Sequence, residues 1–334
     1  MKKVILDVLG GDYGAKSTVD GAVLALKKDQ NLNLVLVGDE KVINEMLAKH
    51  SELKSRIEIV HATVNIEMNE VPTAAIRTKP DSSLVKGMDA LRTREDCAAL
   101  VSAGSTGAVL TGAFMKVGRI PGVSRPALST MLPTLDRKGV LVLDLGANMD
   151  CKAINLVHFA LMADIFMKEQ GIKTPRIGLL NVGTEDEKGN ELTHETFEIL
   201  KKLPINFVGN IEARDAFSGN YDIVVTDGFA GNVLLKTLEG CGKLFSSELK
   251  RAIGGLGGLA GKLLLARRLL KMKRSLSEDA VGGAFLLGTK KPVLKAHGNS
   301  NPRAVCNAIL LAAKIADMDL GEKIAKCISD NNLE

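Results

Sequence analysis

The chain has 334 residues, of which 46% are apolar and 25% charged, with nine phenylalanines, two tyrosines and no tryptophan. This length suits one large α/β unit or two domains, and it can bury a sizeable core without disulfides or metals. The composition excludes a disordered chain, a collagen repeat and a disulfide scaffold, and the scarcity of aromatic residues argues against a stacking surface for single-stranded nucleic acid.

Short runs rich in Val, Ile and Leu alternate with amphipathic stretches along the chain. The predicted strands are 4–9, 32–37, 56–60, 97–102, 140–145, 176–181 and 222–226. The predicted helices are 17–28, 40–50, 82–92, 106–116, 155–170, 191–202, 232–251 and 302–317. Strands that are apolar throughout are typical of parallel strands covered on both faces. The alternation predicts an α/β fold with a doubly wound, mainly parallel sheet in three αβα layers. A barrel of eight such units is the alternative, but the stretch 232–275 breaks an even repeat.

The five cysteines are widely spaced, and no segment reaches the roughly 18 consecutive apolar residues that a transmembrane helix needs. The apolar run after Lys3 meets Asp7 at once, which is too early for a signal peptide. We therefore expect a reduced, cytoplasmic protein.

The net charge of +5 is unevenly distributed. Between Leu249 and Ser277 there are eight basic residues and no acidic residue, whereas the rest of the chain has 36 basic and 39 acidic residues, a net charge of −3. This asymmetry indicates a surface for an anionic partner, which could be a lipid, an acidic protein or a nucleic acid.

Glycine follows six of the predicted strands, often together with Asn, Ser or Thr. These turns are 10–12, 38–40, 103–107, 146–148, 182–185 and 227–232. Ligands of open α/β sheets bind at the carboxyl ends of strands, where glycine lets backbone N–H groups approach an anion. One such turn is most simply a tight connection. Six of them favour one anion-binding rim.

The sequence lacks the usual signatures of a nucleotide-binding or metal-binding site. The sequence has no Walker A run, and the one G-x-G-x-x-G/A match, at 255–260, does not follow a predicted strand. No group of His, Cys or Asp residues has the spacing of metal ligands. We therefore expect neither a metal nor a cofactor.

Several of these turns carry a family resemblance. The stretches are 6–12, 101–108, 118–120, 125–127, 143–148, 178–183, 188–191, 206–212, 227–233 and 295–300. In them, over essentially the whole chain, the sequence resembles the PlsX family of phosphate acyltransferases, which convert acyl-[acyl-carrier-protein] and inorganic phosphate into acyl phosphate. Leu9, the segment 13–15 and Ser105 depart from the family's usual residues, so a His in the first turn and an Asn in the second are missing.

The resemblance implies a fold like that of isocitrate and isopropylmalate dehydrogenases, a role in phospholipid synthesis, and a homodimer. We expect a single α/β unit over 1–334 with a basic helical protrusion at 240–276. Acyl transfer from a thioester to phosphate needs a site for a dianion and donors for an oxyanion, with positioning as the main source of rate.

The catalytic candidates follow from the resemblance. They are Lys188 as the phosphate-facing cation, Asn232 as an oxyanion donor that opens its helix, and His297 as a further contact. On the residue pattern alone, Lys188 is an exposed loop lysine, Asn232 a helix cap and His297 a structural residue. The phosphate- or substrate-binding candidates are Gly10, Gly11, Asp12, Gly104, Ser105, Thr106, Gly107, Asn148, Gly183, Asn210, Asp227, Gly228, Gly231 and Asn299.

Two further residues, Ser105 and Cys151, each allow a catalytic or binding role and a simpler structural one. Ser105 equally suits a simple helix cap, because capping and anion binding use the same geometry. Cys151 could accept an acyl group, but no His base is identifiable beside it, so we favour direct attack by phosphate.

The basic segment predicts an amphipathic helix. Residues Arg267, Arg268, Lys271 and Arg274 fall on one arc, with Leu269 and Leu270 broadly opposite. Such a helix lies on an anionic membrane or docks an acidic protein such as acyl-carrier protein, and a helix packed on the body with one solvated face is the plainer alternative. We expect a cytoplasmic protein that associates peripherally with membranes.

Three other functions remain as alternatives. One is a phosphate acetyl- or butyryltransferase that acts on acyl-coenzyme A. Another is a nicotinamide-dependent dehydrogenase of the isocitrate type, which the missing dinucleotide turn and metal-binding Asp set disfavour. The last is a basic nucleic-acid-binding module, which the few aromatic residues and the net negative body disfavour.

Overall fold

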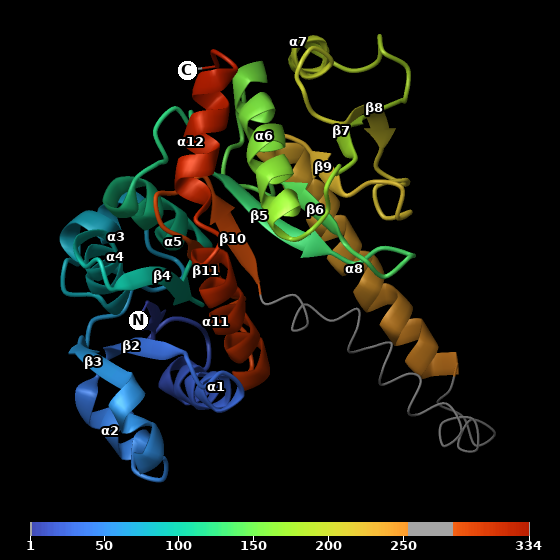
Figure 1. Ribbon diagram of the computed structural model, residues 1–334. Coiled ribbons are helices and arrows are strands. Elements are labelled where there is room, and N and C mark those ends of the chain that lie inside the picture. Colours follow the sequence, from blue (N-terminus) through green and yellow to red (C-terminus); the bar gives the residue numbers. More distant parts are fainter. Residues whose placement is uncertain (1, 253–282, 334) are drawn as a thin grey trace.

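The computed structural model describes residues 2–252 and 283–333 (Figure 1). The strands are β1 (Lys3–Asp7), β2 (Asn33–Gly38), β3 (Ile57–His61), β4 (Cys97–Ser102), β5 (Ala127–Leu132), β6 (Val140–Leu143), β7 (Ile177–Asn181), β8 (Phe207–Glu212), β9 (Ile223–Val225), β10 (Ala284–Leu287) and β11 (Val293–Lys295). The α-helices are α1 (Gly14–Lys28), α2 (Glu40–Leu47), α3 (Pro72–Thr78), α4 (Ser83–Thr93), α5 (Thr106–Gly112), α6 (Ala153–Glu169), α7 (Glu191–Leu200), α8 (Gly228–Ala252), α11 (Pro302–Ala316) and α12 (Leu320–Asp330). All of these strands join one sheet in the order β3-β2-β1-β4-β11-β10-β5-β6-β9-β7-β8.

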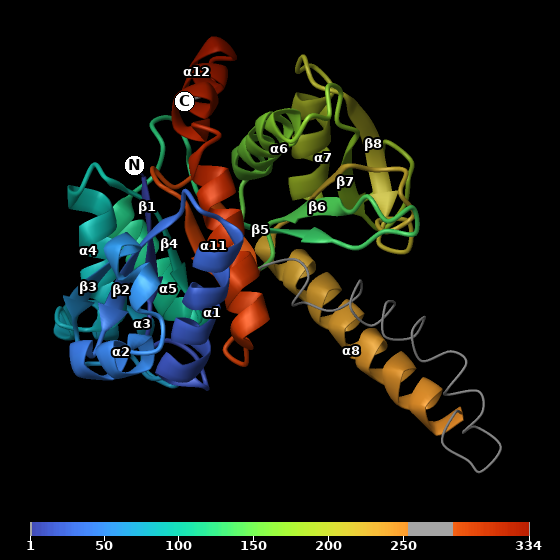
Figure 2. The same ribbon diagram turned by 60° about the horizontal axis from the view of Figure 1, so that its bottom comes forward.

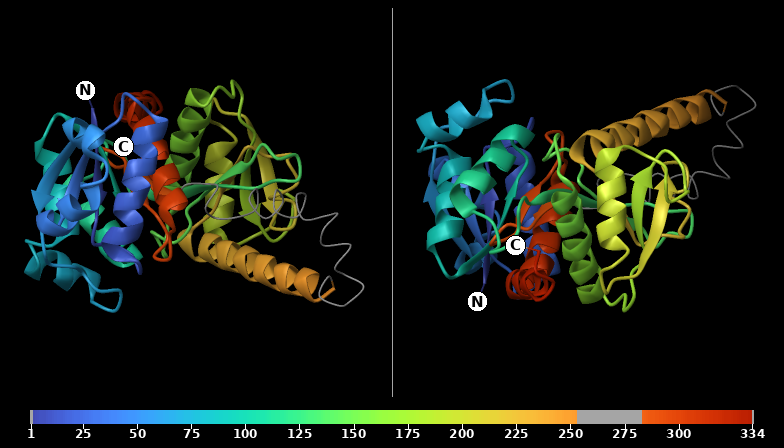
Figure 3. Two further views of the ribbon diagram at one scale, coloured as in Figure 1. Left: turned by 90° about the horizontal axis from the view of Figure 1, so that it is seen from below. Right: turned by 90° about the horizontal axis from the view of Figure 1, so that it is seen from above.

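Both faces of the sheet are covered by helices, so the predicted three-layer fold is confirmed. Successive residues of a strand point to opposite faces. Val4 and Leu6 of β1 accordingly enter one core with residues of α1, α6, α11 and α12, while Ile5 enters the other with residues of α4 and α5. Figure 3 shows these helices on either side of the sheet.

The sheet changes direction in its middle. Strands β1, β2, β3, β4 and β11 are parallel to one another, and so are β6, β7, β8 and β9. Between these groups, β11–β10, β10–β5 and β5–β6 pair antiparallel. Three reversals make the two parallel groups run in opposite directions. Their carboxyl ends therefore lie at opposite edges of the sheet, and the expectation of one continuous rim is wrong.

The seven predicted strands are present, and four others escaped prediction. Strand β5 has Ser129 and Thr130 at its centre, β8 contains Gly209 and Asn210, and β10 and β11 are four and three residues long. Their polar or short sequences lack the apolar run that marked the others. The helix predicted over 106–116 is α-helical only to Gly112 and continues as a π-helical turn over Ala113–Val117.

Helix α8 begins at Gly228 rather than at Asn232 and continues to Ala252. It extends away from the sheet (Figure 2), and Leu244 and Phe245 near its far end are 63% and 79% exposed. Residues Arg267, Arg268, Leu269, Leu270, Lys271 and Arg274 lie outside the described residues, as does the range 253–276 of the predicted protrusion. Within 2–252 and 283–333, no helix combines the length and hydrophobicity of a membrane span.

Candidate active site

Asp7, the last residue of β1, is a buried carboxylate beneath glycine turns. Ser83 Oγ and Ser102 Oγ each donate to it at 2.6 Å, and Ser102 Oγ accepts from the N–H of Gly104 at 3.0 Å. Burial raises the pKa of Asp7 above its ordinary value, opposed by the hydrogen bonds that favour the charged form. The carboxylate thus ties β1 to the turn after β4 and to the start of α4.

The turns after β1, β4 and β11 meet above Asp7, and we call them the Asp7 turns (residues 8–13, 103–105 and 296–300). A Cβ added at Gly10 would lie 2.7 Å from the nitrogen of Gly104, and one added at Gly11 would lie 2.9 Å from the carbonyl oxygen of Gly298. The N–H of Asp12 donates to that same oxygen at 2.7 Å. Only glycine permits this approach, so the predicted candidates from these three turns are brought together.

The first residues of α5 do not have the hydrogen bonding of a simple helix N-cap. Ser105 occupies the N-cap position and is buried, yet its side chain makes no capping hydrogen bond. A Cβ added at Gly107 would lie 2.6 Å from Pro72 Cγ, so Gly107 is needed to pack α5 on α3. Thr106 is the first residue of α5.

The turn after β11 contains His297 and Asn299. The carbonyl of His297 accepts from the N–H of Ser300 at 3.0 Å, and the carbonyl of Ser300 accepts from the hydroxyl of Ser17 at 2.5 Å. His297 is half-buried and Asn299 is exposed. Both therefore belong to the Asp7 turns.

Lys295, the last residue of β11, is a site residue that the sequence reasoning missed. It is half-buried, and its ammonium donates to the carbonyl of Ala296. Burial lowers its pKa to about 8, while the carboxylates of Asp12 and Asp7 favour the charged form. The sequence feature that could have identified it is a lysine at the end of a short apolar strand.

Asp144 directly follows β6 and corresponds to Asp7 at the end of β1. It is buried, and its oxygens accept from the backbone N–H groups of Leu128 at 2.9 Å, Ala147 at 3.1 Å and Asn148 at 2.6 Å. The side chain of Asn148 donates to Asp144 at 2.9 Å and to the carbonyl of Pro126 at 2.8 Å. Burial raises the pKa of Asp144, and these donors oppose the rise. We call the turns after β6 and β9 the Asp144 turns (residues 144–152 and 226–228).

The start of α8 packs tightly on the Asp144 turns. A Cβ added at Gly228 would lie 2.5 Å from the carbonyl oxygen of Asn148, and one added at Gly231 would lie 1.9 Å from that of Asp144. Asp227 supplies the cap, because its Oδ1 accepts from the N–H of Ala230 at 2.7 Å. The alternative that Asn232 caps the helix is therefore wrong.

Asn232 lies inside α8 instead. It is half-buried, and a Cβ added at Gly146 would lie 3.5 Å from its side chain. Asn232 therefore faces the glycine of the turn after β6. Its amide is free of the capping role that the residue pattern alone favoured.

Lys188 lies in a separate loop after β7. Its backbone N–H donates to Glu185, and its carbonyl accepts from the side chain of Asn181 at 2.9 Å. The side chain of Asn210 donates to Glu185 at 2.9 Å. Among the described residues, Asn210 Oδ1 is a buried acceptor without a hydrogen-bond partner. A Cβ added at Gly183 would lie 2.9 Å from Lys188 Cγ, so Gly183, Lys188 and Asn210 come together.

Helix α8 carries two polar side chains on the face that continues from the Asp144 turns. It starts on the Asp144 turns, and two turns later the charge of Lys236 lowers the pKa of Lys295 beside the Asp7 turns. Asn232 and Lys236 are four residues apart, so they lie on one face of α8. The helix therefore presents both polar side chains on one side.

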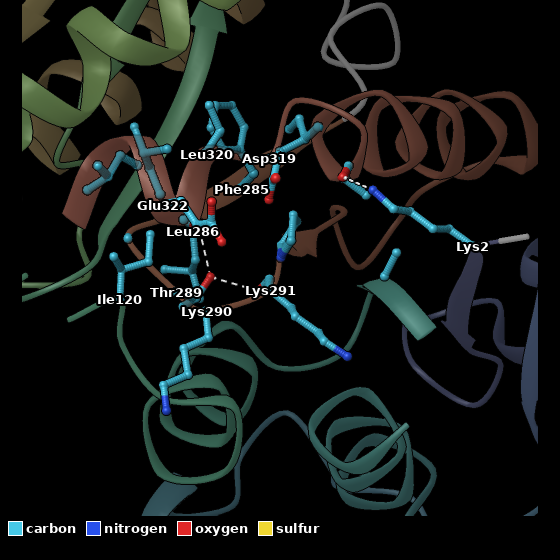
Figure 4. Close-up of a pocket in the computed structure, with 18 of the residues that line it drawn as sticks. Lys2, Ile120, Phe285, Leu286, Thr289, Lys290, Lys291, Asp319, Leu320 and Glu322 are labelled. Carbon is cyan, nitrogen blue, oxygen red and sulfur yellow. Dashed lines mark hydrogen bonds between the residues drawn. The ribbon is translucent and has the colours of Figure 1, made fainter. Parts of the chain in front are cut away.

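A cavity of about 400 Å³ lies elsewhere, where β4 begins and the β10–β11 turn meets α12 (Figure 4). Lys291 in its wall donates to the carbonyls of Leu91, Arg94 and Cys97 at 2.7–2.8 Å, which fixes that turn. The cavity lies at the amino ends of β4 and β11, away from the Asp7 turns. Because it contains none of the predicted site residues, we place the candidate site at the turns.

Residues 2–252 and 283–333 contain no cluster of three or more His, Cys, Asp or Glu side chains suited to a metal ion.

Comparison with known proteins agrees with the resemblance. The family model described as "Fatty acid synthesis protein" matches residues 2–323. A phosphate acyltransferase of Lysinibacillus sphaericus is 46% identical over 310 residues, which covers 92% of each chain. One of Dictyoglomus turgidum is 43% identical over 328 residues, or 96% of each chain.

The chain belongs to this family of phosphate acyltransferases.

Solved structures of other acyltransferases share the fold. A phosphotransacetylase from Streptococcus pyogenes superposes with a TM-score of 0.62 at 17% identity, over 94% of each chain. A branched-chain phosphotransacylase from Enterococcus faecalis gives 0.60 at 14% identity, over 95% of this chain and 99% of its own. At such identities the likeness concerns the fold, which this phosphate acyltransferase family therefore shares.

Proposed function

We propose that this enzyme transfers the acyl group of acyl-[acyl-carrier-protein] to inorganic phosphate and so supplies acyl phosphate for phospholipid synthesis. The observation that carries the proposal is the match at 46% identity over 92% of each chain to a phosphate acyltransferase. The glycine turns agree with it, since glycine-rich turns at the carboxyl ends of strands are typical of anion-binding sites in α/β folds.

The reaction needs no strong acid or base. An oxygen of monohydrogen phosphate attacks the thioester carbon, the C–S bond breaks, and the phosphate's proton ends on the released thiol. Negative charge develops on the carbonyl oxygen in between, so a fixed donor there lowers the barrier. Asn232 is our candidate for that donor, Lys188 for a cation that holds phosphate, and His297 for a further contact.

Direct attack by phosphate is favoured over an acyl-cysteine route. Cys151 is the cysteine nearest this chemistry, and its sulfur contacts the carbonyl oxygen of Asn148 at 3.4 Å. Burial raises its pKa to about 11. A thiol is nucleophilic only as the thiolate, so Cys151 stays unreactive near neutral pH.

The test is phosphate-dependent release of free thiol from acyl-[acyl-carrier-protein], compared with acyl-coenzyme A at the same concentration. We expect rapid release from the carrier-protein substrate only. Preference for acyl-coenzyme A would favour the alternative, a phosphate acetyl- or butyryltransferase. No release from either would contradict the proposal.

We further propose peripheral binding to anionic membranes through the basic segment of the sequence, and a homodimer. Exposed Leu244 and Phe245 on the projecting α8 support a partner for this part of the chain. Reversing the charges of Arg267, Arg268, Lys271 and Arg274 to Glu should abolish sedimentation with anionic vesicles, since each base contributes about 1 kcal/mol at such a surface. Retained sedimentation with a raised KM for acyl-carrier protein would identify a protein-docking segment instead.

The oligomer and the domain organisation have tests of their own. Light scattering should give twice the chain mass of 35.6 kDa for the homodimer. We also propose that residues 1–334 form one α/β unit with a protrusion at 240–276, because one sheet includes strands from both ends of the chain. A single cooperative unfolding transition is expected.

A further inference from the structure

Asn210 of β8 is a polar side chain whose hydrogen bonding does not explain its burial. It is 5% exposed, and its Nδ2 donates to the carbonyl of Glu185 at 2.9 Å. Among the described residues, its Oδ1 has no hydrogen-bond partner. A buried acceptor without a donor costs stability, so an apolar residue would suit this position at least as well. Asparagine at this position therefore calls for an explanation other than stability.

The carbonyl that Asn210 holds begins the turn that ends at Lys188. The N–H of Lys188 donates to the same oxygen of Glu185 at 3.1 Å, and the carbonyl of Lys188 accepts from Nδ2 of Asn181 at 2.9 Å. Asn181 is the last residue of β7, and its Oδ1 accepts from the N–H of Val182 at 2.8 Å. Because β7 and β8 are paired, two asparagines on neighbouring strands hold the backbone on either side of Lys188.

The ammonium of Lys188 is not paired with the acids that precede it in the sequence. Residues 185–187 are all acidic, yet this ammonium makes no ion pair within the described part of the chain. Asp186 pairs with Lys201 instead, at 3.0 Å. The stem of Lys188 packs on Gly183, where an added Cβ would lie 2.9 Å from Lys188 Cγ. The exposed ammonium is therefore available to an anion other than the protein's own carboxylates.

The loop of Lys188 lies at the same edge of the sheet as the Asp144 turns. Strands β6, β9, β7 and β8 are parallel neighbours, so their carboxyl ends share one edge. Leu179 of β7 is level with Val225 of β9, so the end of β7 is level with the residues that lead into α8. A cation in this loop is thus on the side of the sheet where Asn232 lies.

We propose that Asn210 and Asn181 are positioning residues, which fix the backbone of Lys188 so that its ammonium can bind the phosphate dianion. The inference rests on the proposed function and adds two residues that do not touch the reacting atoms. Asn210 acts through its Nδ2 bond to the loop rather than as a phosphate ligand, because its Oδ1 is buried. Displacing a positioned group by about 1 Å is enough to lower a rate strongly.

The first experiment compares Asn210→Leu with Asn206→Leu as the matched control. Leucine has the shape of asparagine without its hydrogen bonds, and Asn206 donates to a backbone carbonyl just before β8, at the opposite edge of the sheet. Asn210→Leu should lower kcat/KM for phosphate about ten- to a hundredfold. Its Tm should stay within about 3 °C of wild type, since the Glu185 carbonyl keeps the N–H of Lys188 as a donor. Asn206→Leu should keep wild-type kcat/KM. A lower Tm with unchanged kcat/KM in Asn210→Leu would overturn the inference.

A double-mutant cycle separates positioning from a structural role. Asn181→Asp keeps the acceptor for Val182 and loses the donor to Lys188, so it should lower kcat/KM about tenfold. In a Lys188→Met background, Asn181→Asp and Asn210→Leu should each change kcat/KM by less than about twofold, because the side chain that they position is gone. The same fold loss with and without Lys188 would contradict the assignment.

Hydrogen exchange tests the positioning without turnover. The backbone N–H groups of residues 183–189 should exchange faster in Asn210→Leu and Asn181→Asp than in wild type and Asn206→Leu, because the loop opens more easily. Unchanged exchange would refute the inference whatever the activity. Inorganic phosphate should also raise the Tm of wild type but not of Lys188→Met. If both results hold while wild type releases no thiol, the proposed function fails and the positioned anion site stands.

A wild type whose Tm does not respond to phosphate would refute the anion site.

Discussion

Asp7 and Asp144 hold equivalent places in the two halves of the sheet, and they differ in what surrounds them. Asp7 ends an apolar strand and Asp144 directly follows one, and each is buried beneath glycine turns. Asp7 accepts chiefly from two serine hydroxyls, with smaller contributions from the backbone N–H groups of Leu9 and Gly10, whereas Asp144 accepts from three backbone N–H groups and one side-chain amide. A hydroxyl can turn to donate or accept, but a backbone N–H can only donate. Position 144 therefore requires a hydrogen-bond acceptor, whereas at position 7 an amide can replace the carboxylate at a lower cost in stability.

The difference extends to the glycines. At Gly231 an added Cβ would lie 1.9 Å from a backbone carbonyl oxygen that cannot move freely. In the other half, a Cβ at Gly10 would lie 2.7 Å from Gly104 N and 2.8 Å from the Asp7 carboxylate. The start of α8 is thus the more rigidly fixed of the two, which suits a helix that projects from the sheet.

The largest effect is expected from Gly231→Ala. The clash with Asp144 should cost more than about 4 kcal/mol in the free energy of unfolding, measured by chemical denaturation. Gly240→Ala in the same helix is the control, because nothing lies within 4 Å of its added Cβ. It should gain about 1 kcal/mol from helix propensity. Equal stability of the two variants would contradict the tight contact, and Gly10→Ala should fall between them.

Asn232→Ala tests the polar face that α8 presents. If its amide stabilises the oxyanion, turnover should fall by roughly 10²–10³. The Tm should change little, since Asp227 rather than Asn232 accepts the N–H bond at the start of the helix. Val233→Ala, at an exposed neighbour, is the control and should keep full turnover. A less stable but fully active Asn232→Ala would show a structural role.

Lys188→Ala tests the third group of candidates, in the loop after β7. Loss of a cation that faces phosphate should lower kcat/KM about ten- to a hundredfold, as for a hydrogen bond to a charged group. The Tm should hold, because removing an exposed lysine changes stability by less than about 0.5 kcal/mol. Lys202→Ala, at another exposed lysine, should have neither effect. Wild-type turnover in Lys188→Ala would leave Lys188 an ordinary loop residue.

The sequence predicted the layers and seven strands because parallel strands buried on both faces are apolar along their whole length. It could not predict the reversal of the sheet, since β5 carries Ser129 and Thr130 and β10 has only four residues. The single rim was therefore wrong, although its glycines do form tight turns. Lys295 escaped prediction because it ends β11, which has only three residues and lacks a long apolar run.

The smallest effects come from the aspartates themselves. Asp144→Asn places an N–H₂ group against backbone donors, so it should lose about 2 kcal/mol, the cost of a buried donor without an acceptor. Asp7→Asn should lose less than about 1 kcal/mol, because Ser83 or Ser102 can turn its hydroxyl to accept. Both are measured as free energies of unfolding near neutral pH. Equal losses would remove the distinction between the two halves.

The pH dependence gives this pair a second readout. Burial raises the pKa of both carboxyl groups, so the folded protein binds their protons more tightly than the unfolded chain. Between the ordinary and the raised pKa, wild-type stability therefore falls as the pH rises. Asparagine does not titrate, so the stability of Asp7→Asn relative to wild type should improve with rising pH across that window. Denaturation curves at several pH values above about 4 measure this slope. A flat difference would mean that burial of the Asp7 carboxylate is fully compensated by its serine hydroxyls.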